Sequence, residues 1–343
     1  MKKILKYVIT IALIVFVLVF VQKLFMPKYV SDVTEGRLIS EYYQEEMDHD
    51  VLFVGDCEVY ENFIPAELWQ DYGINSYIRG SAQQLIWQSY YLLEDALRYE
   101  KPDVVIFNVL SMKYDKPQKE AYNRMSIEGM RWSKSKIDCI NASMTQKESF
   151  IDYVFPILRY HSRWSELTAE DIEHINDTDV RFHNGYYMRV DAKPAENIPE
   201  PEILGDYNFG ENAYKYLDKL TKLCKDEGIE LILIKAPSLY PYWYPEWEEQ
   251  IEKYAFENNL TYINFLELQD ELGMDWSKDT YDAGLHLNYY GGMKVTKYLG
   301  DYLRNEIGLE DRRSDQNLTE IWNEKMARFN EDLNNQLSQL SNK

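Results

Sequence analysis

The sequence predicts a three-layer α/β fold, a mainly parallel sheet with helices on both faces, placed between an N-terminal transmembrane helix and a C-terminal amphipathic helix. Three observations lead to this prediction. Short runs rich in β-branched residues alternate with amphipathic stretches from residue 48 onward. The N-terminus holds a long apolar run without a charge. The last residues carry apolar side chains at steps of three and four.

The predicted sheet has about five strands. They are the β-rich runs 51–54, 75–78, 104–107, 231–234 and 261–264. Between them, residues 85–98 and 212–226 have apolar side chains at helical spacing. Because helices separate most of these strands, parallel pairing with crossover helices is favoured.

The N-terminal run predicts a membrane anchor. It extends from Tyr7 to Val21 without a charge, and no small-residue cleavage site follows it, which favours a retained signal anchor over a cleaved signal peptide. Basic residues before the run favour a cytoplasmic N-terminus. We therefore expect residues 1–27 to cross the bilayer once, residues 28–47 to form a linker or juxtamembrane helix, and the main domain to lie outside the cell.

The remaining chain divides into one domain and a tail. Residues 48–307 contain the alternating strands and helices. Residues 113–206 interrupt this alternation with helical pieces and a Pro-rich stretch, and we interpret them as an insertion over the carboxyl edge of the sheet, where open α/β sheets bind ligands. Residues 308–343 predict an amphipathic helix, which we expect to pack on its own domain in preference to a partner.

Composition excludes several classes of function. The formal net charge of −21 argues against nucleic acid as a partner, since phosphate binding needs clustered Lys and Arg. Three cysteines are too few for a disulfide framework, and no Cys or His spacing indicates a zinc site. We expect neither a metal nor another cofactor. An odd number of cysteines leaves at least one thiol free.

Two blocks far apart in the sequence contain residues suited to nucleophilic catalysis. The first strand is followed by Gly-Asp-Cys-Glu at 55–58, where glycine permits a tight corner and a helix N-terminus behind Cys57 would favour a thiolate or an oxyanion. Near the other end, Asp282 precedes His286 in the stretch Asp-Ala-Gly-Leu-His-Leu-Asn. An Asp shortly before a His can orient the imidazole as a general base.

In this order and setting, the two blocks resemble the first and last blocks of the SGNH/GDSL hydrolases. With its N-terminal anchor, the chain is similar to the extracellular members associated with cell-envelope polymer acylation, such as the D-alanyl-lipoteichoic acid and alginate O-acetylation proteins. The resemblance covers about residues 51–303, and the insertion matches poorly.

The resemblance implies a role for each matching residue. Cys57 would be the nucleophile, His286 the base and Asp282 the orienting acid. The backbone N–H of Cys57, the loop at Gly80 and the side chain of Asn108 would form the oxyanion hole, which binds the charge that develops on the acyl oxygen.

The sequence departs from the family pattern in three ways. Cys57 replaces serine, which makes the nucleophile oxidisable. The acid lies four residues before His286 where the family usually has three, so Asp282 and Asp279 remain alternatives. Asn108 lacks the Gly-x-Asn-Asp setting. The structural alternatives are a small buried residue at Cys57 and a helix-capping residue at His286.

A second group of residues could bind substrate. Arg159, His161 and Arg163 lie close together in the sequence, beside Trp164, and could bind an anionic or sugar substrate. A plain amphipathic helix surface explains them equally well.

These observations favour an acyl-transfer enzyme, an O-acyltransferase or esterase that acts on a cell-envelope polysaccharide or teichoic-acid-like polymer. A membrane-bound O-acyltransferase is a candidate partner, besides the bilayer that holds the anchor. The alternative is a non-catalytic subunit that binds the polymer or assists assembly, which the cysteine and the displaced acid favour. A redox-sensing role would rest on Cys57 alone.

Overall fold

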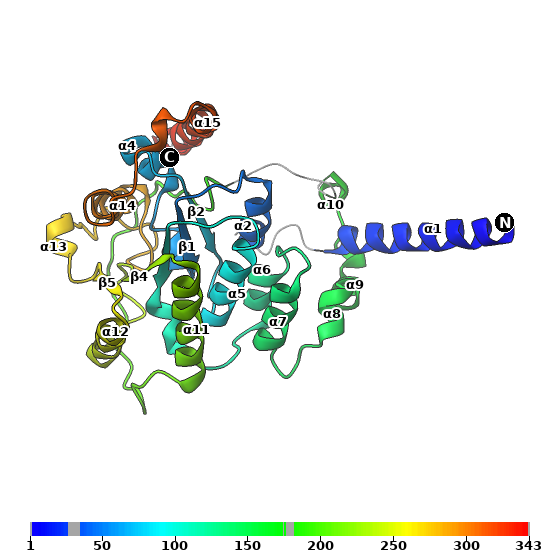
Figure 1. Ribbon diagram of the computed structural model, residues 1–343, viewed down its shortest axis with the longest axis horizontal. Helices are drawn as coiled ribbons and strands as arrows, with labels where there is room; N and C mark the ends of the chain where they lie inside the picture. Colours follow the sequence, from blue (N-terminus) through cyan, green and yellow to red (C-terminus); the bar gives the residue numbers. More distant parts are fainter. Residues whose placement is uncertain (1, 27–34, 174, 176–181, 342–343) are drawn as a thin grey trace.

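A computed structural model describes residues 2–26, 35–173, 175 and 182–341 of the chain (Figure 1). Residues 28–34 of the predicted linker and residues 174 and 176–181 of the predicted insertion lie outside the described residues. The same holds for the two ends of the chain, at 1 and 342–343.

Five parallel strands form the sheet, in the order β2-β1-β3-β4-β5. They are β1 (Val51–Gly55), β2 (Ser76–Gly80), β3 (Val104–Asn108), β4 (Glu230–Lys235) and β5 (Thr261–Asn264). All five predicted strands are confirmed, with bounds that differ by a residue or so. Because every pair is parallel, the residues that follow the strands meet at one edge of the sheet.

Helices cover both faces of this sheet, which confirms the predicted α/β fold. One face packs against α5 (Ile86–Ala96), α11 (Glu211–Glu227) and α12 (Pro245–Asn258). The other packs against α4 (Pro65–Tyr72) and α14 (Tyr289–Tyr302). Alternate residues of β1 supply the two cores, since successive side chains of a strand point to opposite faces.

The apolar run forms α1 (Lys2–Phe25), which projects from the domain (Figure 1). Its mean hydropathy over the best window is 2.9, and it is long and apolar enough to cross a membrane. Its side chains from residue 3 to residue 20 are exposed. This exposure suits a segment whose solvent is lipid.

The interpretation of residues 113–206 needs a correction. Most helices of this segment lie beside α5 and α1 (Figure 1), and α6 (Glu120–Ile127) reaches the carboxyl edge through Ser126, whose hydroxyl bonds to that of Ser81 after β2. The others are α7 (Lys134–Ser143), α8 (Phe150–Val154), α9 (Ile157–Tyr160), the 3₁₀ helix η3 (His161–Ser165) and α10 (Ala169–Glu173). The extended part after residue 182 crosses that edge, where Tyr187 N donates to Tyr60 O over 2.8 Å and Lys193 N to Thr280 O over 2.9 Å.

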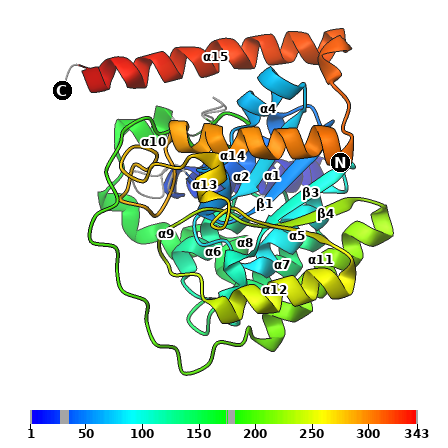
Figure 2. The ribbon, with the colours of Figure 1, turned by 90° about the vertical axis from the view of Figure 1, so that its left-hand side faces the viewer.

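The C-terminal tail forms α15 (Gln316–Ser341), which packs on its own domain (Figure 2). Trp322 stacks on Trp69 of α4, with ring centres 5.2 Å apart and an angle of 7° between the planes. Its Nε1 donates to Asn75 Oδ1 over 3.0 Å. The short elements that remain are α2 (Glu35–Glu41), η1 (Tyr42–Gln44), α3 (Cys57–Tyr60), η2 (Val109–Lys113), α13 (Gln269–Leu272), the π-helical turn η5 (Leu303–Ile307) and η6 (Arg312–Ser314).

Candidate active site

Cys57 lies at the corner between β1 and α3. A side chain at Gly55 would bring its Cβ within 2.5 Å of Val59 Cγ2, so this close turn requires glycine. Asp56 caps α3, and its carboxylate accepts from Glu58 N over 3.3 Å. The helix expected behind Cys57 is a single turn, too short to favour a thiolate strongly. The Cys57 side chain is half-buried.

His286 is held from two directions by the carboxylate of Asp282. Its Nδ1 atom lies 2.7 Å from Asp282 Oδ2, and its backbone N–H donates to Oδ1 over 2.8 Å. The other ring nitrogen, Nε2, is buried and has no hydrogen-bond partner of normal geometry within the described residues. The ring and the Cys57 thiol are nevertheless close enough for each to shift the pKa of the other. Nε2 is therefore the nitrogen left for the thiol proton.

The loop before His286 accommodates the extra residue between acid and base. Ala283 and Gly284 both have positive φ, at +67° and +100°, and Thr280 Oγ1 accepts from Gly284 N over 2.8 Å. This tight loop returns the chain so that Asp282 reaches the imidazole. Asp279, the other candidate, instead pairs with Lys294 Nζ at 2.6 Å. The geometry therefore favours Asp282 as the partner of His286.

A second acid, which sequence reasoning missed, also faces the imidazole. Glu61 Oε2 lies 3.5 Å from His286 Nδ1 and accepts a hydrogen bond from the Tyr281 hydroxyl. The Tyr281 ring stacks on the imidazole, with centres 6.1 Å apart and planes 17° apart. Arg189 in turn lies 4.4 Å from the centre of the Tyr281 ring. The sequence shows that an acid lies four residues after Cys57. It does not show that this side chain points toward His286.

Burial dominates the protonation of this cluster. It raises the pKa of the Cys57 thiol, an effect that His286 opposes and that Asp56 and Glu61 reinforce. Burial alone would lower the pKa of His286, but Cys57, Glu61 and Asp282 raise it well above its usual range. Burial thus favours the neutral thiol at Cys57, whereas the charges around His286 favour its protonated form. Only the neutral imidazole can take the thiol proton.

The structure does not support the oxyanion role implied for Asn108. Its Nδ2 atom donates to Asp56 Oδ1 and to Glu58 Oε2, both over 3.0 Å, and its Oδ1 accepts from Ala236 N over 3.0 Å. Because Nδ2 has two hydrogens and both are directed at carboxylates, none remains for an acyl oxygen. Asn108 instead anchors two acids on either side of Cys57.

Glu58 belongs to a fully buried ion pair under the corner. Lys235 Nζ lies 3.0 Å from Glu58 Oε1 and 2.9 Å from Oε2, and it also donates to Ser238 Oγ over 3.1 Å. The Ser238 hydroxyl donates to Glu58 Oε1 over 2.6 Å. Burial, followed by the charge of Glu58, raises the pKa of Asp56 to about 6. Each polar group of the pair has a partner, as a buried charge requires.

Lys113 is a further charged group near the thiol. It ends η2, its side chain is half-buried, and its ammonium lies 5.1 Å from the centre of the Tyr114 ring. Burial lowers the pKa of Lys113, while Asp56, Glu58 and Cys57 oppose this effect. A cation at this place would attract an anionic group that approaches the corner.

Gly80 lies beside the same corner, as β2 ends next to β1. A Cβ at Gly80 would be 3.2 Å from Gly55 O and 3.5 Å from Asp56 O. The backbone of the Gly80 loop thus approaches the Cys57 corner as closely as a glycine allows.

Arg159, His161 and Arg163 lie away from Cys57, which corrects their assignment to a substrate site. Arg163 Nη1 donates to Phe25 O at the end of α1 over 2.7 Å. Arg159 pairs with Glu120 at 2.8 Å, and His161 Nδ1 bonds to Leu158 O at 2.9 Å. These three residues are far from the thiol because α9 and η3, which carry them, pack beside α1.

Comparison with known proteins adds little to this geometry. No family model matches the sequence, and no curated protein matches it. Among solved structures, the chain is similar to a Bacteroides fragilis protein provisionally described as an acylhydrolase, with 12% identity and a TM-score of 0.38 over 78% of this chain and 95% of that one. A likeness this weak assigns no activity.

Proposed function

We propose that the protein is an acyl-transfer enzyme in which Cys57 is the nucleophile, His286 the general base and Asp282 the acid that orients the imidazole. The contact of His286 Nδ1 with Asp282 at 2.7 Å, with Nε2 left on the side of the thiol, carries this proposal. Nucleophilic acyl transfer needs this arrangement, in which an acid holds one nitrogen of the base and the other nitrogen faces the nucleophile.

The proposed reaction has two steps. The thiol proton moves to Nε2 as sulfur attacks the acyl carbonyl carbon; the bond to the leaving alcohol then breaks, and the alcohol takes that proton. Water or a second hydroxyl next attacks the thioester and gives its proton to His286; the carbon–sulfur bond then breaks, the acyl group leaves on the new oxygen, and His286 returns the proton to the sulfur. With Asn108 committed elsewhere, the backbone N–H groups of Cys57 and of the Gly80 loop remain as the proposed oxyanion donors.

The proposed substrate is a cell-envelope polysaccharide or a teichoic-acid-like polymer, outside a membrane that α1 crosses once. The family resemblance of the two sequence blocks supports this substrate, and the basic residues before the apolar run support a cytoplasmic N-terminus. A membrane-bound O-acyltransferase is the proposed partner. An esterase and a transferase differ here only in whether water or a sugar hydroxyl reaches the thioester.

A specific observation also favours a non-catalytic, polymer-binding role. The raised pKa of Cys57 keeps it protonated at neutral pH, and the amide at the implied oxyanion position is engaged by carboxylates. A protonated thiol and an engaged amide are the features expected of a chain that keeps the fold but has lost catalysis.

Reactivity of Cys57 separates the two functions. Incubation of the full chain in detergent with p-nitrophenyl acetate should release nitrophenol in a burst and leave an acetyl group on Cys57, which mass spectrometry of peptides detects. His286→Ala should slow this burst about a hundredfold or more, because general-base catalysis typically contributes that much. Cys57→Ser should keep partial turnover, and Cys57→Ala none.

The matched control is the double variant Cys139→Ala with Cys224→Ala, which removes the two buried thiols. Burial raises the pKa of each to about 12, so their loss should leave the burst unchanged. Acetylation of Cys57 at the same rate with and without His286, or none in the folded wild-type chain, would leave polymer binding as the better account.

A further inference from the structure

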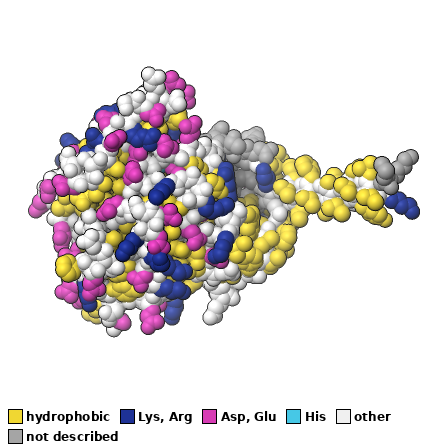
Figure 3. All heavy atoms as spheres, in the orientation of Figure 1, with side chains coloured by type: hydrophobic (Ala, Val, Ile, Leu, Met, Phe, Trp, Pro, Cys, Tyr) yellow, Lys and Arg dark blue, Asp and Glu magenta, His cyan; other side chains and the backbone are white. Residues whose placement is uncertain are grey.

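An apolar surface lies beside the base of α1. It consists of exposed side chains on the short helices and turns of residues 113–173: Trp132, Ile151, Leu158, Trp164 and Ile172, each between 46% and 72% exposed. We call these five residues the membrane-side face. Hydrophobic side chains on the domain continue directly from those of α1 (Figure 3). Contiguous exposed apolar surface of this kind marks an interaction site.

The length of the helix brings this face to the bilayer. The stretch between Lys6 and Lys23 has no charged residue and spans roughly 26 Å at about 1.5 Å per residue. The hydrocarbon core of a bilayer is about 30 Å thick. Because the charge-free stretch is shorter than the core, the end of α1 near Lys23 has no spare length with which to hold the domain above the lipid.

The end of α1 is tied to the helices that carry the membrane-side face. Arg163 donates from Nη1 to Phe25 O over 2.7 Å, and from Nη2 to Asp171 Oδ1 over 3.0 Å. Helix α1 also contacts α9, η3 and α10. The depth of the helix in the membrane therefore sets the depth of Leu158, Trp164 and Ile172 as well.

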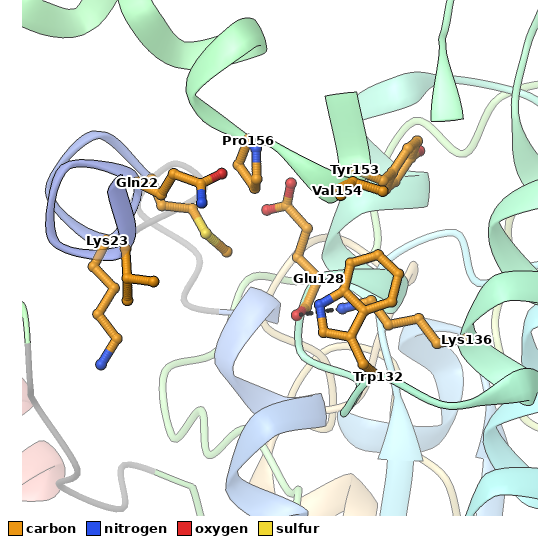
Figure 4. A pocket seen from close by; sticks show the side chains of 10 residues that line it. Gln22, Lys23, Glu128, Trp132, Lys136, Tyr153, Val154 and Pro156 are labelled. Atoms are coloured by element: carbon orange, nitrogen blue, oxygen red, sulfur yellow. Dashed lines mark hydrogen bonds between the residues drawn. The ribbon is translucent and has the colours of Figure 1, made fainter. Parts of the chain in front are cut away.

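A cavity of about 210 Å³ opens between α1 and the domain (Figure 4). Its lining combines apolar residues, among them Val19 and Trp132, with the charged residues Lys23, Glu128 and Lys136. Gln22 Oε1, which also faces this gap, is buried without a hydrogen-bond partner among the described residues. A mixture of apolar and charged lining suits the headgroup level of a bilayer.

We propose that the bilayer leaflet next to the domain covers the membrane-side face. The domain is then seated in the lipid interface by Trp132 and Trp164, with α1 as its pivot, and does not swing freely on a tether. Tryptophan is the side chain most suited to this level, since its ring is amphipathic. This proposal rests on α1 as a membrane span and does not depend on the chemistry of Cys57.

Quenching of tryptophan fluorescence by brominated lipid tests the proposal. The full chain would be reconstituted in phosphatidylcholine vesicles with or without bromine near the headgroup end of the acyl chains. Helix α1 contains no tryptophan, and Trp132 and Trp164 are the two that the structure describes as exposed. Bromine should quench part of the emission, and the double variant W132F/W164F should abolish that part while α1 still holds the chain in the vesicles.

Matched variants make the result specific. Trp276→Phe, next to α13 and far from α1, should leave the quenched part unchanged. In the W132F/W164F background, Leu158→Trp should restore quenching, whereas Phe256→Trp, on the exposed surface of α12, should not. Emission insensitive to bromine in the wild type would overturn the proposal and indicate a protein partner or a second copy on this face. Equal quenching of Phe256→Trp would overturn it too.

Discussion

Cys57 lies between two clusters of charged residues that differ in burial and in completeness. On one side, His286 is paired with Asp282 through Nδ1, while Nε2 has no hydrogen-bond partner of normal geometry among the described residues. On the other, Glu58 and Lys235 are buried, and each of their charged groups has several partners. Both clusters contain a carboxylate and a cation. Among the described residues of these two clusters, the unpaired polar atom is Nε2 of His286.

This difference separates a reactive arrangement from a structural one. A buried ion pair that is fully hydrogen-bonded has no capacity to transfer a proton, and its loss is costly because one charge would stay buried alone. A neutral imidazole held at Nδ1 can accept a proton at Nε2. We therefore expect changes on the Lys235 side to affect mainly stability and changes on the His286 side to affect mainly the reactivity of Cys57.

The largest expected effect is on the Lys235 side. Lys235→Met should lower the free energy of unfolding by about 3–5 kcal/mol, because Glu58 would remain buried without its cation. Denaturant titration of the full chain in detergent measures this loss. Lys222→Met, which removes an exposed helix pair with Asp226, is the control and should change stability little. A loss no larger than that of the control would abolish the distinction between the two sides.

The next effect is on the His286 side. Asp282→Asn should slow the reaction of Cys57 with an activated ester about a hundredfold, since the imidazolium that forms would lose its neighbouring charge. Asp279→Asn is the matched control: it removes the partner of Lys294 but no contact with His286. Stopped-flow release of nitrophenol measures both. Equal rates for the two variants would mean that Asp282 has no role in positioning the base.

The smallest expected effect is a displaced pH profile. Because burial raises the pKa of Cys57, alkylation by iodoacetamide should increase with pH through a midpoint above the usual thiol value of about 8.5. His286→Gln should move that midpoint higher still, because the charge of His286 lowers the pKa of Cys57 and the variant removes it. Rates measured across the alkaline range, with glutathione as the reference thiol, give both midpoints. A midpoint below that of glutathione would show that Cys57 is instead an activated thiolate.

The architecture was predictable because hydrophobic periodicity is local. The alternation of runs such as 51–54 and 104–107 with amphipathic stretches predicted the five strands and the parallel sheet, and the stripe through Trp322 predicted the tail helix. The placement of Cys57 directly after the first strand followed from the same local signals, whereas its pairing with His286, on the loop before α14, was predicted from the family resemblance of the two blocks. The inferences from local signals need only the chain direction and the period of the pattern.

The tertiary structure decided which side chains face one another. It directed Asp282 to His286 through the positive φ angles of Ala283 and Gly284, and it committed Asn108 to two carboxylates. It also carried Arg163 to the end of α1, away from the thiol. The physical reason is common to these cases: hydrogen bonds between residues distant in sequence depend on the packing of whole elements, and no spacing along the chain records which way a side chain points once they pack.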